Sequence, residues 1–253
     1  MIYGLYLSAT GVMANSYRQD VIGNNLANSE TVGFKRNLAM FQERSTEAKA
    51  RGLGPSSTDP MLERLGGGLL LSPTMVDTSQ GELEQTGNPL DVAIQGQGYL
   101  MVDDHGQQRL TRDGRMMIDR TGHLVMANGE GQRVLDGAGK PIVLQLSART
   151  EIGDDGQISQ DGQAVARLGV YRPADEGKLK NKGGNLLAIM DGRPPTAVEA
   201  TVRSGFVERA NVDPSTELVQ LMETQRMLEA NANMIRYQDQ TLSRLVNDVG
   251  RIG

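Results

Sequence analysis

The sequence contains no cysteine and no tryptophan, and it has only two histidines, His105 and His123. The lack of cysteine excludes disulfide bonds, thiolate zinc sites and a cysteine nucleophile. Each histidine lies beside a predicted turn, without a second imidazole close by in the sequence. We interpret both as surface residues, so the sequence predicts no metal and no cofactor.

Basic charge is also in short supply, since 26 Lys and Arg stand against 31 Asp and Glu, a formal net charge of −5. This balance argues against affinity for nucleic acid or for an anionic membrane surface. The Gly66-Gly67-Gly68 run lacks the Lys-Ser/Thr of a phosphate-binding loop, and serines such as Ser159 lack a G-x-S-x-G context. We therefore predict a protein that is not an enzyme, with no catalytic residues and no small-molecule substrate.

A long hydrophobic run is missing at the N-terminus as well. Gly4 and Gly11 interrupt the first apolar stretch, and the first basic residue, Arg18, comes only after it. A cleaved signal peptide has the opposite order, and a membrane span needs about 20 mostly apolar residues. We expect export, if it occurs, to proceed without a cleaved signal peptide.

Turn signals are abundant in the middle of the chain, between residues 72 and 204. Asp-Gly and Asn-Gly pairs allow the positive φ of hairpin turns, so this region predicts an antiparallel β domain built from hairpins. Residues 99–102, 116–118 and 123–126 are strand candidates between these turns. The turn signals lie at residues 104–106, 113–114, 121–122, 128–129, 136–137, 155–156 and 161–162.

The C-terminal region predicts one long helix over residues 213–249. Asp213 suits an N-cap and Pro214 the first helical position, while Glu217 favours the dipole of the first turn. Steps of three and four residues from Leu218 give a mostly apolar seam typical of a coiled coil. The seam positions are Leu218, Leu221, Gln225, Leu228, Ala232, Ile235, Asp239, Leu242, Val246 and Val249.

The N-terminal region, about residues 2–28, also favours helix, but its apolar side chains fall on nearly every side of the helical wheel. A helix that is apolar all round has to be buried all round, and one partner helix covers only one stripe. Either neighbouring subunits supply the missing partners, or the helix lies deep in the core of its own chain.

These patterns together predict an α+β fold: a discontinuous α-helical coiled-coil module from both termini and a mainly antiparallel β domain. The expected segments are residues 1–40 (N-terminal helix and motif), 41–71 (linker or extended arm), 72–204 (β body) and 205–253 (heptad helix packing on the N-terminal helix). Pro55, Pro60 and the glycine run suggest the arm, which is narrowest at 45–68.

Three stretches resemble the bacterial flagellar axial proteins, which include rod, hook and hook-associated subunits. Residues 23–35, GNNLANSETVGFK, match the N-terminal signature except for Gly23, where Ser is usual. Residues 87–99 resemble the segment that enters the β body, and residues 205–213 the start of the C-terminal region, with Ala210 where Ser is common. The candidate assembly residues are Asn24, Asn25, Leu26, Ala27, Asn28, Thr31, Gly33, Phe34, Asn88, Pro89, Leu90, Asp91, Gly205, Glu208, Asn211, Val212, Leu218, Leu221, Leu228, Asn231, Ile235 and Leu242.

The resemblance implies a structural subunit of the flagellar basal-body rod, and most resembles the proximal-rod type, with the distal-rod type second. Such subunits pass through the flagellar type III export apparatus and polymerise helically in the cell envelope. Their terminal helices form an inner tube, the β body faces outward, and torque passes from motor to hook. The implied partners are further copies, other rod subunits and the axial proteins of the hook-basal body.

Two other classes stay open from the residues alone. One is a β-rich surface adhesin or carbohydrate-binding module with a coiled-coil stalk, although a stalk does not need an N-terminal helix that is apolar all round. The other is a hydrolase on a β scaffold, which the composition disfavours.

Overall fold

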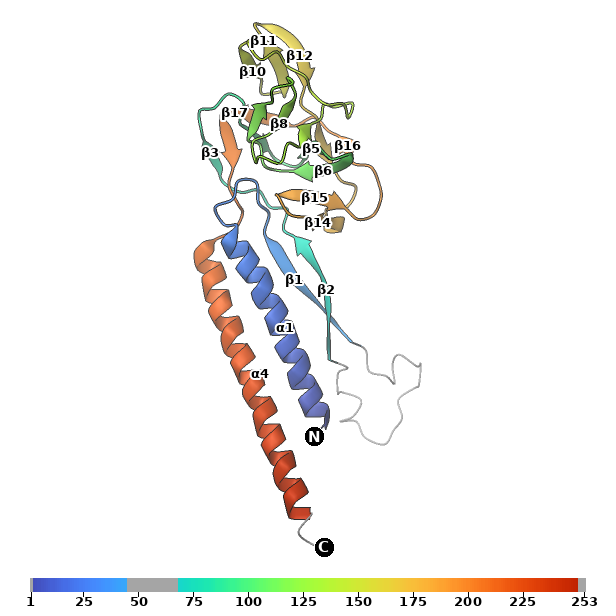
Figure 1. The fold of residues 1–253 in the computed structure, drawn as a ribbon, viewed down its shortest axis with the longest axis vertical. Coiled ribbons are helices and arrows are strands. Elements are labelled where there is room, and N and C mark those ends of the chain that lie inside the picture. The colour runs from blue at the N-terminus through green and yellow to red at the C-terminus, as the bar shows by residue number, and fades with distance from the viewer. Residues whose placement is uncertain (1, 45–67, 250–253) are drawn as a thin grey trace. The chain divides into compact units, whose positions relative to one another are not determined.

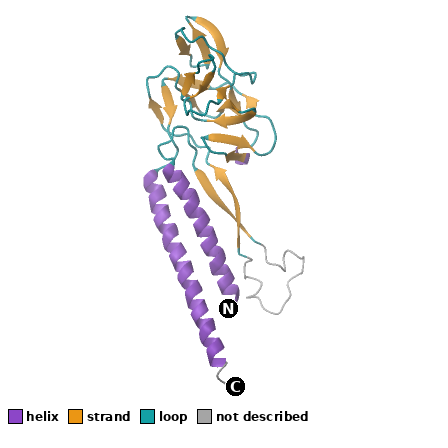
Figure 2. Ribbon diagram, in the orientation of Figure 1, coloured by secondary structure: helices purple, strands orange, loops and turns teal. Residues whose placement is uncertain are grey.

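A computed structural model describes residues 2–44 and 68–249 of the chain (Figure 1). It has an α+β fold with two long helices and mainly antiparallel strands (Figure 2). The chain divides into two compact units. The helical unit comprises Met1–Leu26, Leu38–Thr74 and Pro214–Gly253, and the β unit comprises Ala27–Asn37 and Met75–Asp213.

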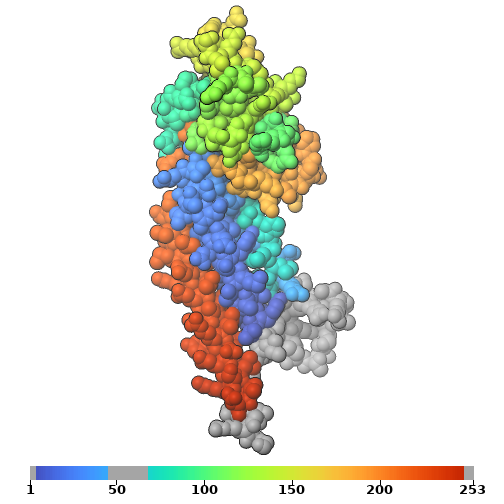
Figure 3. Space-filling view, in the orientation of Figure 1, coloured from blue at the N-terminus to red at the C-terminus, as the bar shows by residue number. Residues whose placement is uncertain are grey.

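The helical unit holds α1 (Ile2–Ala27) and α4 (Pro214–Val249), which run antiparallel and lie side by side (Figures 1 and 3). Pro214 opens α4, where its missing N–H costs nothing, and Glu217 lies in the first turn. Both predicted helices are thus present. None of the described helices is long and apolar enough to cross a membrane.

A two-stranded ribbon of β1 (Asn37–Glu43) and β2 (Leu69–Val76) is a partner of α1 that the sequence analysis missed. The Tyr17 hydroxyl donates to the Ser72 carbonyl over 3.0 Å, and the Tyr17 ring meets the Phe41 ring edge-on at 6.1 Å. Residues 41–43 and 69–71, assigned to the arm, therefore lie in strands. Residues 45–67 of that arm lie outside the described residues.

The burial of α1 falls between the two expectations for it. Ala14, Val21 and Ile22 are buried, whereas Met13 is 60% exposed and Leu7 37%. The ribbon and α4 cover two sides of the helix, and an apolar remainder faces outward. The chain alone thus buries part of this helix, and other subunits would be needed to bury the rest.

Two positions of the predicted seam on α4, Leu218 and Val246, are 50% and 70% exposed in this chain. Gln225 and Asp239 are exposed too, whereas Leu221, Leu228, Ala232, Ile235 and Leu242 are half-buried; the side chain of Val249 lies outside the described part. Glu217 and Thr224, at 1% and 2% exposure, lie inward instead. The inward face of α4 is therefore more polar than apolar periodicity predicts.

The β unit is built from short strands joined mostly by tight turns. Its nine-stranded sheet has the order β14-β15-β6-β5-β9-β8-β7, with β13 pairing β5 and β16, and smaller sheets join β10-β11-β12, β17-β4 and β18-β3. Residues 99–102, 116–118 and 123–126 fall in or beside β5, β7 and β8, as predicted. The strands are β3 (Leu83–Gln85), β4 (Val92–Gln95), β5 (Tyr99–Asp104), β6 (Gln107–Thr111), β7 (Met116–Ile118), β8 (Leu124–Met126), β9 (Arg133–Val134), β10 (Thr150–Ile152), β11 (Gln157–Gln160), β12 (Gln163–Arg167), β13 (Val170–Arg172), β14 (Leu179–Asn181), β15 (Leu186–Ile189), β16 (Thr196–Ala197), β17 (Thr201–Ser204) and β18 (Phe206–Glu208), with a 3-10 turn η1 at Glu176–Lys178.

The hairpin prediction holds where glycine supplies a positive φ. His105 and Gly106, at φ 51° and 86°, close the β5–β6 hairpin, and Asp161 and Gly162 close β11–β12. The turn expected at residues 113–114 is wrong, because β6 and β7 do not pair with each other. A Cβ on Gly114 would collide with the Val92 carbonyl, so this glycine allows a close backbone approach.

The β unit has two hydrophobic clusters on the two faces of β5. Leu100 and Val102 pack in the first cluster, and Tyr99 and Met101 in the second, as the alternation of a strand requires. Val92 and Ile94 of β4 and Val202 of β17 belong to the first cluster. The second predicted motif, residues 87–99, therefore leads directly into the core.

Candidate functional site

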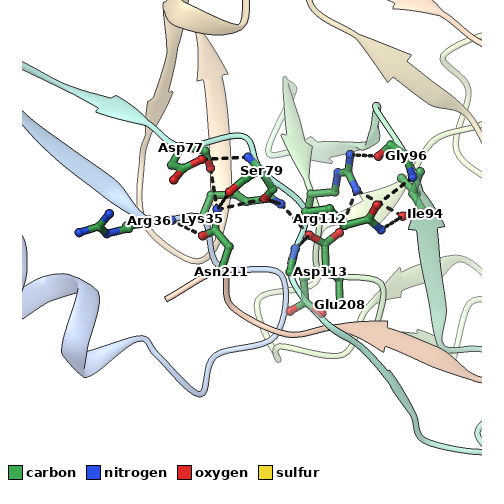
Figure 4. A network of polar contacts seen from close by, with 12 residues as sticks. Lys35, Arg36, Asp77, Ser79, Ile94, Gly96, Arg112, Asp113, Glu208 and Asn211 are labelled. Atoms are coloured by element: carbon green, nitrogen blue, oxygen red, sulfur yellow. Dashed lines mark hydrogen bonds and ion pairs between the residues drawn. The ribbon is translucent and has the colours of Figure 1, made fainter. Parts of the chain in front are cut away.

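Three charged side chains from distant parts of the sequence meet inside the β unit: Lys35, Arg112 and Glu208 (Figure 4). The Lys35 ammonium lies 2.6 Å from Glu208 Oε1, and Arg112 Nη1 lies 2.8 Å from Glu208 Oε2. The side chains are 1%, 3% and 1% exposed for Lys35, Arg112 and Glu208. We call these three residues the charge cluster.

Backbone groups complete the charge cluster. The ammonium also donates to the Ser79 carbonyl over 2.6 Å, and Gly81 N–H donates to Glu208 Oε1 over 2.9 Å. Arg112 donates to the carbonyl oxygens of β4 and its end, at Ile94 and Gly96, over 3.3 Å and 2.6 Å. The cluster therefore links segments near residues 35, 80, 95, 112 and 208 through one carboxylate.

The electrostatics of the charge cluster depend on that carboxylate. Burial lowers the pKa of Lys35, and the attraction of Glu208 opposes this effect. The Arg112 guanidinium lies 5.1 Å from the centroid of the Tyr99 ring, which favours a cation over its face. One carboxylate thus pairs with two buried cations and holds their segments together. No group of three His, Asp or Glu side chains that could hold a metal occurs among the described residues.

Asn211 forms a second junction next to the charge cluster (Figure 4). Its Oδ1 accepts from the Arg36 N–H over 2.7 Å, and its Nδ2 donates to the carbonyl oxygens of Asp77 and Ser79, each over 3.0 Å. The Asp77 N–H donates to the Arg36 carbonyl over 2.8 Å. A single amide therefore joins the segments that contain residues 36, 77–79 and 211.

The first motif, residues 23–35, ends α1 and turns into the β unit. Thr31 N–H and Oγ1 both donate to Asn28, over 3.0 Å and 3.3 Å, and Phe34 is 3% exposed. Gly33 has φ 71°, and a Cβ there would collide with the backbone nitrogen of Asp113. The Gly33 N–H donates to the Glu208 carbonyl over 2.7 Å, so this motif meets the third one.

The second motif also meets the third. Asp91, 7% exposed, accepts from the Thr86 hydroxyl over 2.7 Å and from Asn88 Nδ2 over 2.9 Å. Its carbonyl accepts from Gly205 N–H over 2.8 Å, and Ser204 Oγ donates to the Pro89 carbonyl over 2.9 Å. Gly205 has φ 76°, which explains glycine at this position.

The remaining predicted residues divide between the two units. Asn25 Nδ2 donates to Glu217 Oε2 over 3.4 Å within the helix pair. Val212 is buried and Leu90 half-buried, and Asn24 and Ala27 are exposed. Leu26, Leu221, Leu228, Asn231, Ile235 and Leu242 are half-buried on the helices, and Leu218 is exposed.

Four important residues are absent from the predicted set: Lys35, Arg112, Asn25's partner Glu217, and Ser79. Lys35 is the last residue of the first motif, but a lysine is usually solvated, so its burial does not follow from the sequence. Arg112 precedes the Asp113-Gly114 pair, which predicts a turn. A charged residue next to a predicted turn is expected at the surface, so the burial of Arg112 could not be predicted.

Comparison with known sequence families gives three matches in chain order. Residues 5–35 match the family described as "Flagella basal body rod protein", residues 93–166 "Flagellar hook protein FlgE/F/G D1 domain", and residues 203–248 "Flagellar basal body rod FlgEFG protein C-terminal". The first and third matches include Lys35 and Glu208, and the second includes Arg112.

Full-length relatives give the same result. The chain is 32% identical to the flagellar basal-body rod protein FlgG of Bacillus subtilis, over 98% of this chain and 99% of that protein. It is 31% identical to the rod protein FlgF of Mesorhizobium japonicum, over 97% of each chain. It is 33% identical to FlgF of Caulobacter vibrioides, over 98% of this chain and 97% of that protein.

Proposed function

Because the chain belongs to the flagellar basal-body rod protein family, as its three motifs predict, we propose how this structural rod subunit assembles and carries load. Its role is structural and not enzymatic, and its place is the flagellar basal body. The terminal helices polymerise with other subunits, and the charge cluster and Asn211 hold segments of the β unit together against the resulting torque.

The load-bearing proposal rests on how the chain is threaded. It passes between the two units four times, after Leu26, Asn37, Thr74 and Asp213. Inside the β unit, the segments next to these crossings are bonded to one another through Gly33 and Glu208, through Arg36 and Asp77, and through Asn211. A force that arrives along one segment is therefore shared among several.

The polymerisation proposal rests on the exposed apolar surface of the helices. Exposed apolar side chains gathered on one helix mark a protein contact. Methionine side chains among them can adapt their shape to non-identical neighbours. Head-to-tail contacts then build an open helical assembly. The exposed apolar residues of α4, each 43% to 70% exposed, are Leu218, Val219, Met222, Met227, Met234, Tyr237, Leu245 and Val246.

Further parts of the proposal concern the form of the helices in the rod, the export of the subunit and its partners. Its helices form a coiled-coil module in the rod, it reaches the envelope through the flagellar export apparatus without a cleaved signal peptide, and its partners include hook-basal body axial proteins. Ordering a helix costs conformational entropy, and a helix without partners gains no burial in return. The terminal helices therefore stay unfolded until export, and premature polymers do not form.

Complementation of a deletion strain tests the proposal. Leu26→Asp or Ile235→Asp places a carboxylate in a half-buried helix contact, which costs on the order of several kcal/mol unless the group is protonated. We expect both variants to abolish swimming and to leave purified basal bodies with rings but no rod. The control Val165→Asp, at a 48% exposed position of β12, is expected to swim. Normal swimming of both helix variants would contradict the assigned role of the helices.

A further inference from the structure

Three polar residues of α4, Glu217, Asn231 and Gln238, are separated by multiples of seven residues, and each has a counterpart on α1. Asn25 Nδ2 donates to Glu217 Oε2. A Cβ added to Gly11 would lie 2.9 Å from Asn231 Nδ2, and a Cβ added to Gly4 would lie 2.9 Å from Gln238 Nε2. The side-chain amides of Asn231 and Gln238 thus occupy the space that a Cβ at Gly11 or Gly4 would need.

The spacing of these contacts is the same on both helices. From Asn25 to Gly11 is 14 residues and on to Gly4 is 7; from Glu217 to Asn231 is 14 and on to Gln238 is 7. Each pair of numbers therefore adds up to 242, as an antiparallel pair in one continuous register requires. Seven residues is two helical turns, so all three contacts lie on one stripe of each helix.

We propose that these small-against-large contacts fix the register of α1 against α4. Glycine weakens a helix interior, so two glycines seven residues apart in α1 need a structural reason, and the amides of Asn231 and Gln238 provide it. The third glycine of α1, Gly23, is a natural contrast, since a Cβ there would meet nothing within 4 Å.

A slipped register loses these contacts. A shift of α4 by seven residues one way sets Thr224 against Gly11, and a shift the other way sets Leu245 against Gly4. Either shift separates Asn25 from Glu217. The half-buried apolar residues Leu221, Leu228, Ile235 and Leu242 repeat every seven residues on α4, so they discriminate less between these registers. Polar and small residues therefore supply the register, as single buried polar residues do in coiled coils.

The inference concerns the helix pair that the proposed function uses, but its test needs no rod. The chain has no cysteine, so two introduced cysteines report one distance without background. The in-register reporter carries Gly4→Cys and Gln238→Cys, and the slipped reporter carries Gly4→Cys and Leu245→Cys. In the purified full-length chain we expect mild oxidation to close the first disulfide at least about tenfold faster than the second.

A size exchange then tests the cause. In the in-register reporter, Gly11→Asn sets two amides against each other and is expected to slow disulfide closure about tenfold. Adding Asn231→Gly restores one small and one large partner with the original composition, and is expected to bring the rate back to within about threefold. The control Gly23→Asn leaves the rate unchanged.

Equal closure of both reporters, equal effects of Gly11→Asn and Gly23→Asn, or no rescue by Asn231→Gly would each overturn the inference. Failure of the proposed function has a different signature. A chain that keeps the in-register disulfide but does not restore swimming to a deletion strain would refute the rod assignment and leave the register mechanism standing.

Discussion

Replacing the carboxylate of Glu208 by an amide is the most direct perturbation of the charge cluster. Glu208→Gln keeps the shape of the side chain but leaves Lys35 and Arg112 buried without an anion. The carboxylate accepts three bonds, from Lys35 over 2.6 Å, from Arg112 over 2.8 Å and from Gly81 N–H over 2.9 Å. Removing one partner of a buried ion pair costs about 3–5 kcal/mol, and we expect a loss of about 4 kcal/mol in the free energy of unfolding.

Urea unfolding of the full-length chain measures this loss. Near-ultraviolet circular dichroism, to which the buried Tyr99 and Tyr171 of the β unit contribute, follows the transition. The matched control is Glu84→Gln, which removes the exposed partner of Arg209, 3.6 Å away, with side chains 60% and 50% exposed. Exposed pairs contribute at most about 1 kcal/mol, so the control is expected to lose less than that.

A second substitution separates charge from packing. Lys35→Met removes one of the two cations, so in the Glu208→Gln background it relieves an unpaired buried charge. We expect the double variant to be more stable than the sum of the two single losses by about 1–3 kcal/mol. A loss below about 1 kcal/mol for Glu208→Gln, or strict additivity of the pair, would refute the reasoning that one anion stabilises two buried cations.

Two further predictions concern the β unit. Burial raises the pKa of Tyr99, so above pH 10 the hydroxyl ionises first in the unfolded state, and the free energy of unfolding falls by about 1.4 kcal/mol per pH unit for this group. We expect Tyr99→Phe to reduce the slope of stability against pH above pH 10 by that amount, while Tyr171, whose pKa is also raised, remains in both chains. Identical slopes for the two chains would contradict the assignment. Gly33→Ala meets backbone in the left-handed region, whereas Gly87→Ala, at φ 74°, meets nothing within 4 Å. We therefore expect Gly87→Ala to lower the free energy of unfolding in urea by about 1–3 kcal/mol, and Gly33→Ala to lower it clearly more. Equal losses would show that the backbone around Gly33 moves to accommodate the added methyl group.

Much of the local structure followed from short stretches of sequence. Pro214 and Glu217 predict the start of α4, and Asp-Gly or Asn-Gly pairs predict turns where a positive φ is needed, as at His105 and Gly106. These features depend on neighbouring residues only. The same local rule failed at Asp113 and Gly114, because glycine there serves a close contact with Val92, which local sequence does not reveal.

The sequence by itself determined the family, the two terminal helices and the hairpin character of the β body, because motifs, caps and turn residues act over a few positions. Only the tertiary structure decided which polar groups are buried. Lys35 and Glu208 are 173 residues apart, and no periodicity relates them. Similarly, Glu217 and Thr224 are buried on α4, and the Asn231 side chain fits against Gly11, because contacts with elements distant in the sequence decide which side of α4 is covered.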